Sequence, residues 1–169
     1  MNILLEKDTL YSRVVEIADQ INEDYQNKNP VLVGILKGAF VFMADLIRNI
    51  NIPVEVDFLC IASYDGKDSS GVVRLSNDLS INIEDRDVIV VEDIIDSGRT
   101  ISFIMDNLST RRPRSIGVCT LLNKKEDRMV DVPLAYVGFN IPSVFVVGYG
   151  LDYENQYRNL PYIGVLDGS

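Results

Sequence analysis

The chain has 169 residues, of which 47% are hydrophobic and 24% are charged, and its formal net charge is −9. This composition is typical of one packed soluble domain that needs no disulfide or structural metal, and the acidic balance argues against a general nucleic-acid binder. No apolar run reaches the ~20 residues of a membrane span, and the first residues lack the long apolar core of a signal peptide. We therefore expect a cytoplasmic protein with a single domain, residues 1–169, and neither nucleic-acid nor membrane partners.

The chain contains no histidine, which excludes a Ser-His-Asp triad, a Cys-His nucleophile pair and a histidine-ligated zinc site within one chain. Acid-base chemistry must then fall to Asp, Glu, Lys or Tyr. The two cysteines, Cys60 and Cys119, each lie in an apolar stretch. They are predicted to be buried free thiols rather than a redox pair.

The first half of the chain alternates helical and extended patterns. Apolar residues recur at helical spacing over residues 9–26, which predicts an amphipathic helix. Residues 31–36 form a short apolar run, typical of a strand covered on both faces. Gly38 marks a turn before a buried helix at residues 39–48, and the alternation at residues 54–61 predicts a partly exposed strand.

Residues 63–77 show little periodicity and contain glycines, serines and charges. A loop of that length inside a compact domain is usually functional or disordered. We therefore expect no regular structure in this segment.

Residues 88–91 predict a second doubly buried strand, followed by an acidic turn and a helix at about residues 100–108. Further strands are expected at residues 116–122, 135–139 and 144–147. Strands that alternate with helices in this way predict an α/β fold, with a parallel sheet between helices on both faces.

The most informative segment is VIVVEDIIDSGRT, residues 88–100. Glu92 and Asp93 are expected at the carboxyl end of a buried strand, where ligands bind in open α/β sheets. Paired carboxylates there are costly unless they bind a positive group or accept hydrogen bonds. The turn that follows presents backbone N–H groups, two hydroxyls and the positive end of a helix dipole, which together favour a phosphate.

The alternative for this segment is an ordinary acidic helix N-terminus, in which Asp96 or Ser97 caps the helix and the acid pair is solvated. Two known phosphate motifs are absent from the sequence, because it has neither a G-x-x-x-x-G-K-[ST] loop nor a G-x-G-x-x-G turn after a strand. Gly98 would let the backbone approach a ligand closely.

The same segment resembles the phosphoribosyl-pyrophosphate motif of the type I phosphoribosyltransferases: hydrophobic residues, two acids, two hydrophobics, and Asp-Ser-Gly-X-Thr. Four further segments resemble the hypoxanthine-guanine phosphoribosyltransferases, in chain order: VGILKGAFVF, IASYDG, LLNKK and VGFNIPSVFVVGYGLDYENQYRNLPYIGVL. The resemblance covers nearly the whole chain. It implies the type I phosphoribosyltransferase fold, a parallel sheet with flanking helices and a small hood built from the N- and C-terminal segments.

The resemblance also implies an activity. The family moves a 5-phosphoribosyl group from phosphoribosyl pyrophosphate to a 6-oxopurine, here hypoxanthine and guanine, in purine salvage, giving IMP or GMP and pyrophosphate with Mg²⁺ as cofactor. A homodimer or homotetramer is expected by resemblance alone. Two alternatives remain: a xanthine-preferring relative, and a non-catalytic regulator with the same fold.

The resemblance assigns three groups of residues to the phosphoribosyl pyrophosphate donor. They are the 5′-phosphate loop Asp96, Ser97, Gly98, Arg99 and Thr100; the ribose and magnesium residues Glu92 and Asp93; and the pyrophosphate contacts Lys37, Gly38, Arg158, Ser63 and Tyr64.

Two features of the donor site carry further expectations. The resemblance implies that the peptide bond linking Lys37 and Gly38 can be cis, which would expose two N–H groups to pyrophosphate; an ordinary strand-to-helix turn is the alternative. Residues 63–77 match a mobile flap, whose closure would exclude water from the reacting ribose.

On the purine side, Lys124 matches the lysine that donates to the 6-oxo group and so disfavours adenine. A one-residue shift would give this role to Lys125, and a solvated lysine pair is the other alternative. Phe145 would stack on the base and the backbone of Val146 would read its edge, unless both belong to a core strand. Asp152 would be a second magnesium ligand near the pyrophosphate, or else a helix cap.

Asp96 matches the group that accepts a proton from the purine ring nitrogen, so it is the expected catalytic residue. Its contribution is expected to be modest, because stabilising the charge at an oxocarbenium-like ribose matters more in such a reaction.

Overall fold

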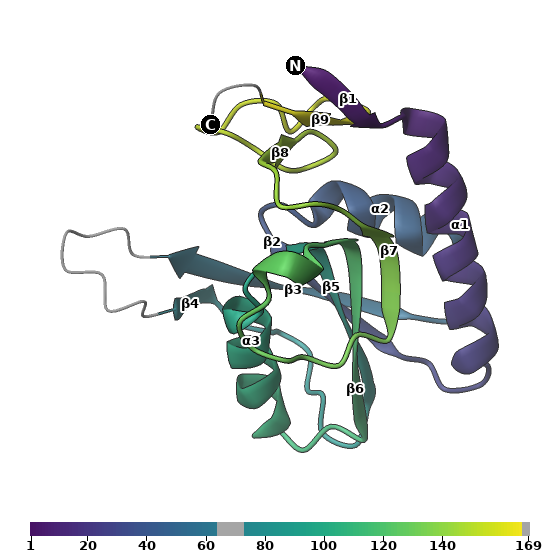
Figure 1. Ribbon diagram of the computed structural model, residues 1–169. Helices are drawn as coiled ribbons and strands as arrows, with labels where there is room; N and C mark the ends of the chain where they lie inside the picture. The colour runs from purple at the N-terminus through teal and green to yellow at the C-terminus, as the bar shows by residue number, and fades with distance from the viewer. Residues whose placement is uncertain (64–72, 167–169) are drawn as a thin grey trace.

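The computed structural model describes residues 1–63 and 73–166, which form two sheets with helices around the larger one (Figure 1). The elements in chain order are β1 (Asn2–Leu5), α1 (Lys7–Asp24), β2 (Val31–Leu36), α2 (Phe40–Asn49), β3 (Glu55–Ser63), β4 (Val73–Asn77), β5 (Asp87–Ile95), α3 (Arg99–Ser109), β6 (Ser115–Asn123), the short 3-10 helix η1 (Lys125–Asp127), β7 (Tyr136–Asn140), β8 (Val146–Val147) and β9 (Ile163–Val165).

The larger sheet has the strand order β4-β3-β2-β5-β6-β7. Its strands pair in parallel except at one edge, where β4 is antiparallel to β3. Helix α3 covers one face, and α1 and α2 cover the other (Figure 1). The α/β fold and the parallel sheet predicted from the sequence are therefore confirmed.

Side-chain alternation along β2 explains why both faces of the sheet are covered. Val31 and Val33 belong to the hydrophobic cluster that includes α3, whereas Leu32 belongs to the cluster that includes α1 and α2. A strand with apolar side chains on both faces would lose stability if either face met water. It is therefore stable only in the middle of such a layered fold.

The smaller sheet is antiparallel and has the order β1-β9-β8, so it joins the two ends of the chain. In Figure 1 it lies beyond one end of the main sheet. Neither β1 nor β9 was expected from the sequence, because each is very short and forms only by pairing with strands that are distant in the chain or equally short: β1 with β9, and β9 with both β1 and β8. Within residues 1–63 and 73–166, no helix has the length and apolar character needed to cross a membrane.

Two expected boundaries were wrong. Strand β5 does not end at residue 91 but continues to Ile95, because its last residues pair with β6 through Ile94↔Leu122 and Ile95↔Asn123. Residues 73–77 of the expected loop form β4, which is held by its pairing with β3. The other part of the expected flap, residues 64–72, lies outside the described residues.

Both cysteines are free, as predicted. Cys119 is fully buried, and burial raises the pKa of its thiol. Cys60 is only half-buried, because it lies on β3 near the edge of the sheet. The prediction of a buried thiol therefore holds for Cys119 alone.

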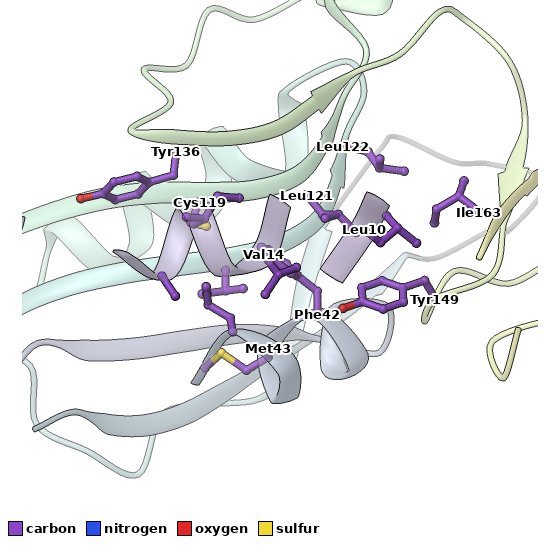
Figure 2. Close-up of a cluster of buried hydrophobic side chains, with 14 of the residues drawn as sticks. Leu10, Val14, Phe42, Met43, Cys119, Leu121, Leu122, Tyr136, Tyr149 and Ile163 are labelled. Atoms are coloured by element: carbon purple, nitrogen blue, oxygen red, sulfur yellow. The ribbon is translucent and has the colours of Figure 1, made fainter. Parts of the chain in front are cut away.

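Figure 2 shows the cluster between the sheet and its two covering helices, where Leu10 and Val14 of α1 gather with Phe42 and Met43 of α2. All four side chains are buried. Since large-to-small changes in such a core leave a cavity that relaxes only in part, the packing can be tested by truncating one of them.

Met43→Ala is expected to lower the free energy of unfolding by about 2–5 kcal/mol, the usual cost of such a cavity. The matched control is Met129→Ala, since Met129 is 68% exposed, and its effect should stay within about 0.5 kcal/mol. Urea denaturation followed by circular dichroism measures both. Equal losses for the two variants would contradict the packing described here.

Candidate active site

The turn between β5 and α3 presents backbone N–H groups to a cavity. Gly98 occupies the N-cap position of α3 with a left-handed φ of +84°, so the cap residue has no side chain. Ser97 Oγ accepts only a long hydrogen bond, 3.4 Å, from the N–H of Arg99. The alternative in which Asp96 or Ser97 is the cap residue is therefore wrong. The first turn of α3 keeps N–H groups available for an anion.

A distant segment of chain holds this turn in place. The N–H groups of Met129 and Val130 both donate to the Ser97 carbonyl oxygen, at 2.9 and 3.0 Å. The Nε of Arg128 donates to the carbonyl oxygen of Asp96 at 3.1 Å. The sequence carries no signal for these contacts, which depend on how the segment after η1 folds back.

Glu92 and Asp93 form an acid pair near the end of β5, in which Glu92 is buried and Asp93 is partly buried. Glu92 is 8% exposed, and burial raises its pKa well above the ordinary value, with a further rise from the neighbouring Asp93 charge. Burial also raises the pKa of Asp93, against the opposing effect of hydrogen bonds such as the one from the Ile94 N–H at 2.8 Å. The alternative of a solvated pair is therefore wrong for Glu92, whereas Asp93 is partly exposed.

This acid pair fits a divalent cation bound jointly with a substrate. Its surroundings disfavour the charged carboxylates, so an added positive charge would be stabilised there. Within the part of the chain that the structure describes, no three acidic or cysteine side chains are grouped to hold a metal ion. Mg²⁺ would thus need oxygen ligands from a substrate or water, which is how it usually binds near phosphates.

The loop between β2 and α2 lies directly against this pair. A Cβ atom on Gly38 would lie 1.7 Å from Asp93 Oδ2, so only glycine allows this approach. The peptide bond between Leu36 and Lys37 is cis. The implied cis bond was therefore placed one residue too late, at Lys37–Gly38, because neither bond involves a proline and no sequence signal separates them.

The segment between β8 and β9 contributes a second charged pair. Arg158 Nη2 lies 2.7 Å from Asp152 Oδ1, and Arg158 Nη1 donates to the Gly150 carbonyl oxygen at 2.7 Å. Asp152 also accepts a hydrogen bond from the N–H of Asn155 at 2.8 Å, which closes a turn. The alternative role of Asp152 as a helix cap is wrong, because no helix follows it between β8 and β9.

Lys124 and Phe145 line one cavity together with Asp93 of the acid pair. Lys124 is 8% exposed and its Nζ lies 3.3 Å from Asp96 Oδ2, whereas Lys125 is exposed. This difference favours Lys124 for the purine and contradicts the solvated lysine pair. Phe145 is 40% exposed and meets Tyr153 edge to face, with ring centroids 5.7 Å apart, so it is not a core residue.

Two neighbouring cavities collect nearly all the residues assigned from the sequence. The first, of about 290 Å³, is lined by Ser97, Gly98 and Thr100 of the turn before α3 and by the acid pair. The second, of about 350 Å³, is lined by basic, acidic and apolar residues that include Lys37, Lys124, Phe145, Val146, Asp152 and Arg158. Both include Gly38, Asp93, Ile94 and Asp96, so the cavities meet at the end of β5.

A few assigned residues are not brought into these cavities. The side chain of Arg99 does not line either of them, although its N–H belongs to the turn. Tyr64 and the side chain of Ser63 lie outside the described residues. Ile61, Ile94 and Leu151 line the cavities but were not assigned from the sequence, where an apolar residue at a strand end gives no signal of a binding role.

Comparisons with known proteins identify the family of this chain. The model of the phosphoribosyl transferase domain matches residues 2–154. A hypoxanthine-guanine phosphoribosyltransferase of Streptococcus pyogenes serotype M3 is 46% identical over 165 residues, 97% of this chain and 92% of that protein. The bifunctional protein TilS/HprT of Listeria monocytogenes serotype 4b is 46% identical over 165 residues, 97% of this chain, but this chain spans only 26% of its length.

Solved structures extend the comparison to three dimensions. A crystal structure of a hypoxanthine-guanine phosphoribosyltransferase from Bacillus anthracis matches with a TM-score of 0.94 at 44% identity, covering 98% of both chains. The chain therefore belongs to the type I phosphoribosyltransferase family. Within this family, it is similar to the hypoxanthine-guanine phosphoribosyltransferases.

The raised pKa of Glu92 predicts a pH-dependent stability. A carboxyl group whose pKa is higher in the folded state lowers the free energy of unfolding at a pH above its folded-state pKa, where it must be charged. It has no such effect at a pH below its ordinary pKa, which is 4.5 for Glu92. Glu92→Gln is therefore expected to raise the free energy of unfolding at neutral pH without divalent cations. The gain should vanish as the pH falls below 4.5, as measured by urea denaturation across pH.

Glu23→Gln, an exposed substitution on α1, is the control and should show no such trend. A stability gain for Glu92→Gln that is the same at acid and neutral pH would show that the buried charge is not its cause.

Proposed function

We propose that the protein transfers the 5-phosphoribosyl group of phosphoribosyl pyrophosphate to hypoxanthine and guanine, releasing pyrophosphate. The observation that carries this proposal is the junction of the two cavities at Gly38, Asp93, Ile94 and Asp96. One cavity has the anion-binding turn and the acid pair, and the other has a buried lysine and an exposed aromatic ring. A sugar phosphate in the first would meet a flat base in the second.

Mg²⁺ fits the proposed donor site. When bound, it would neutralise charge on the pyrophosphate and hold it for departure. Glu92 and Asp93 would face the ribose hydroxyls and the ion, and Asp152 would hold a second ion near the pyrophosphate. The N–H groups of residues 97–100 would hold the 5′-phosphate, while Lys37, Gly38 and Arg158 would bind the pyrophosphate.

Asp96 and Lys124 would each contact the purine, Asp96 as a proton acceptor and Lys124 as a hydrogen-bond donor. A bond forms between the purine nitrogen and C1′ of the ribose, the bond from C1′ to pyrophosphate breaks, and Asp96 accepts the proton that the nitrogen loses. Lys124 donates to the 6-oxo oxygen, which an adenine cannot match because its 6-amino group is itself a donor. The 3.3 Å contact between Lys124 Nζ and Asp96 Oδ2 supports these paired roles.

Five further expectations from the sequence belong to this proposal. The chain would act as one domain in which the small sheet is the hood over the base, and residues 63–77, with Ser63 and Tyr64, would form the closing flap. The family resemblance supports a homodimer or homotetramer, and the absence of a signal-peptide core in the first residues supports a cytoplasmic location.

Pyrophosphate release with each base tested separately distinguishes the candidates. Mg²⁺-dependent turnover with hypoxanthine and guanine supports the proposal, and turnover mainly with xanthine supports the xanthine-preferring alternative. A folded protein that binds phosphoribosyl pyrophosphate but turns over no base would be the non-catalytic regulator.

Asp96→Asn is expected to lower kcat by about 10²-fold, the lower end of general-base contributions. Steady-state kinetics with hypoxanthine measures this loss. Asp106→Asn, an exposed change on α3, is the control and should retain wild-type kcat. If Asp96→Asn is as active as the control, Asp96 is not the proton acceptor.

Lys124→Ala is expected to lower kcat/KM for hypoxanthine by about 10- to 100-fold, the value of a hydrogen bond from a charged donor. Lys125→Ala, at the exposed neighbouring position, should change it by less than about twofold. A larger loss for Lys125→Ala than for Lys124→Ala would shift the purine contact by one residue.

A further inference from the structure

Tyr149 connects the segment between β8 and β9 to helix α2. Its side chain is buried, and its hydroxyl donates to Asp45 Oδ2 at 2.5 Å. Figure 2 shows the ring extending from the C-terminal segment toward α2. Burial, with the Asp45 carboxylate beside it, raises the pKa of this hydroxyl, so it remains a donor.

The turn that contains Tyr149 lies against the pyrophosphate loop. Tyr149 has a left-handed φ of +50°, and its N–H donates to the Leu160 carbonyl oxygen at 2.8 Å. A Cβ atom on the next residue, Gly150, would lie 2.2 Å from the carbonyl oxygen of Gly38. The turn and the loop therefore touch through their backbones, and a shift of one moves the other.

The same turn holds Arg158 by two reciprocal hydrogen bonds. The N–H of Gly150 donates to the Arg158 carbonyl oxygen at 3.0 Å, and Arg158 Nη1 donates to the Gly150 carbonyl oxygen at 2.7 Å. Both the backbone and the guanidinium group of Arg158 thus depend on the position of Gly150.

Helix α2 completes the connection. It begins at Phe40, just after the pyrophosphate loop, and Asp45 lies in its second turn. Asp45 also pairs with Arg48, one turn further along α2. The hydrogen bond between Tyr149 and Asp45 therefore ties the helix that follows Lys37 and Gly38 to the turn that holds Arg158.

We propose that Tyr149 and Asp45 are positioning residues, which hold Gly38 and Arg158 at the spacing that pyrophosphate requires. Neither side chain lines the two cavities of the active site, so both act through the backbone of the turn and the loop. The proposal rests on the proposed function. It predicts an effect confined to the pyrophosphate end of the site, because Lys124 and Phe145 have no part in this connection.

Tyr149→Phe tests the proposal, since it removes one hydroxyl and keeps the ring. The KM for phosphoribosyl pyrophosphate and the Kd for pyrophosphate with Mg²⁺ should rise by about fivefold or more, as for a lost buried hydrogen bond. The KM for hypoxanthine should change by less than about twofold, because a distant, unconnected site is not affected.

Tyr136→Phe is a matched control from the same core cluster. The Tyr136 hydroxyl also donates to a carboxylate at 2.5 Å, that of Asp24, and Figure 2 shows Tyr136 at the opposite end of the cluster from Tyr149. A purely structural role would make the two variants alike: both less stable on heating, with unchanged affinity for the donor. That result would overturn the proposal.

Substitutions of Asp45 provide an independent test. Asp45→Asn keeps an oxygen that accepts the Tyr149 hydroxyl and should retain wild-type affinity for pyrophosphate, whereas Asp45→Ala should match Tyr149→Phe. The double variant Asp45→Ala with Tyr149→Phe should be no weaker than either single variant, because both lose the same bond. Additive losses would overturn the proposal.

These results are separable from the proposed function. A wild-type protein with no phosphoribosyl transfer would refute the proposed function itself. A fully active wild type whose Tyr149→Phe variant binds pyrophosphate normally would refute only the positioning role.

Discussion

The close contact between Gly38 and Asp93 is the constraint on which the rest of the site depends. It brings the loop after β2 against the end of β5, two strands that are neighbours in the sheet. A side chain at position 38 would separate the loop from the acid pair. Under the proposed function, it would also separate the pyrophosphate end of the site from the ribose end. The parallel sheet places β2 beside β5, and the missing Cβ atom of Gly38 lets the loop come into contact with Asp93.

The central part of the fold could be predicted from local sequence patterns. Apolar runs such as residues 31–36 must be covered on both faces, and their alternation with helices leads to a parallel sheet. The sequence-based predictions were wrong where pairing with another strand decides whether a strand forms or where it ends. Strand β5 runs on to Ile95 because β6 accompanies it, and β1 forms only because β9 lies beside it. Single-sequence patterns contain neither piece of information.

In the candidate site, too, some residues could be predicted from the sequence and others could not. The turn at residues 96–100 and the acid pair could be found from the sequence, because their residue types suit phosphate and cations. The residues that hold them could not. Arg128 supports the Asp96 carbonyl oxygen from a segment with no motif, and Tyr149 reaches Asp45 across 104 positions of chain. The cis bond at Leu36–Lys37 shows the same limit, since no local pattern distinguishes it from the bond that follows.

The contact between Lys124 and Asp96 has a consequence for the two substrates. In the structure these opposite charges neutralise one another. Under the proposed function, Lys124 and Asp96 each contact the purine base instead of one another. The base is neutral, so its binding adds no net charge to the site. Phosphoribosyl pyrophosphate instead brings several negative charges into a protein whose own net charge is −9. Ionic strength should therefore alter the affinity for the donor strongly and the affinity for the purine very little.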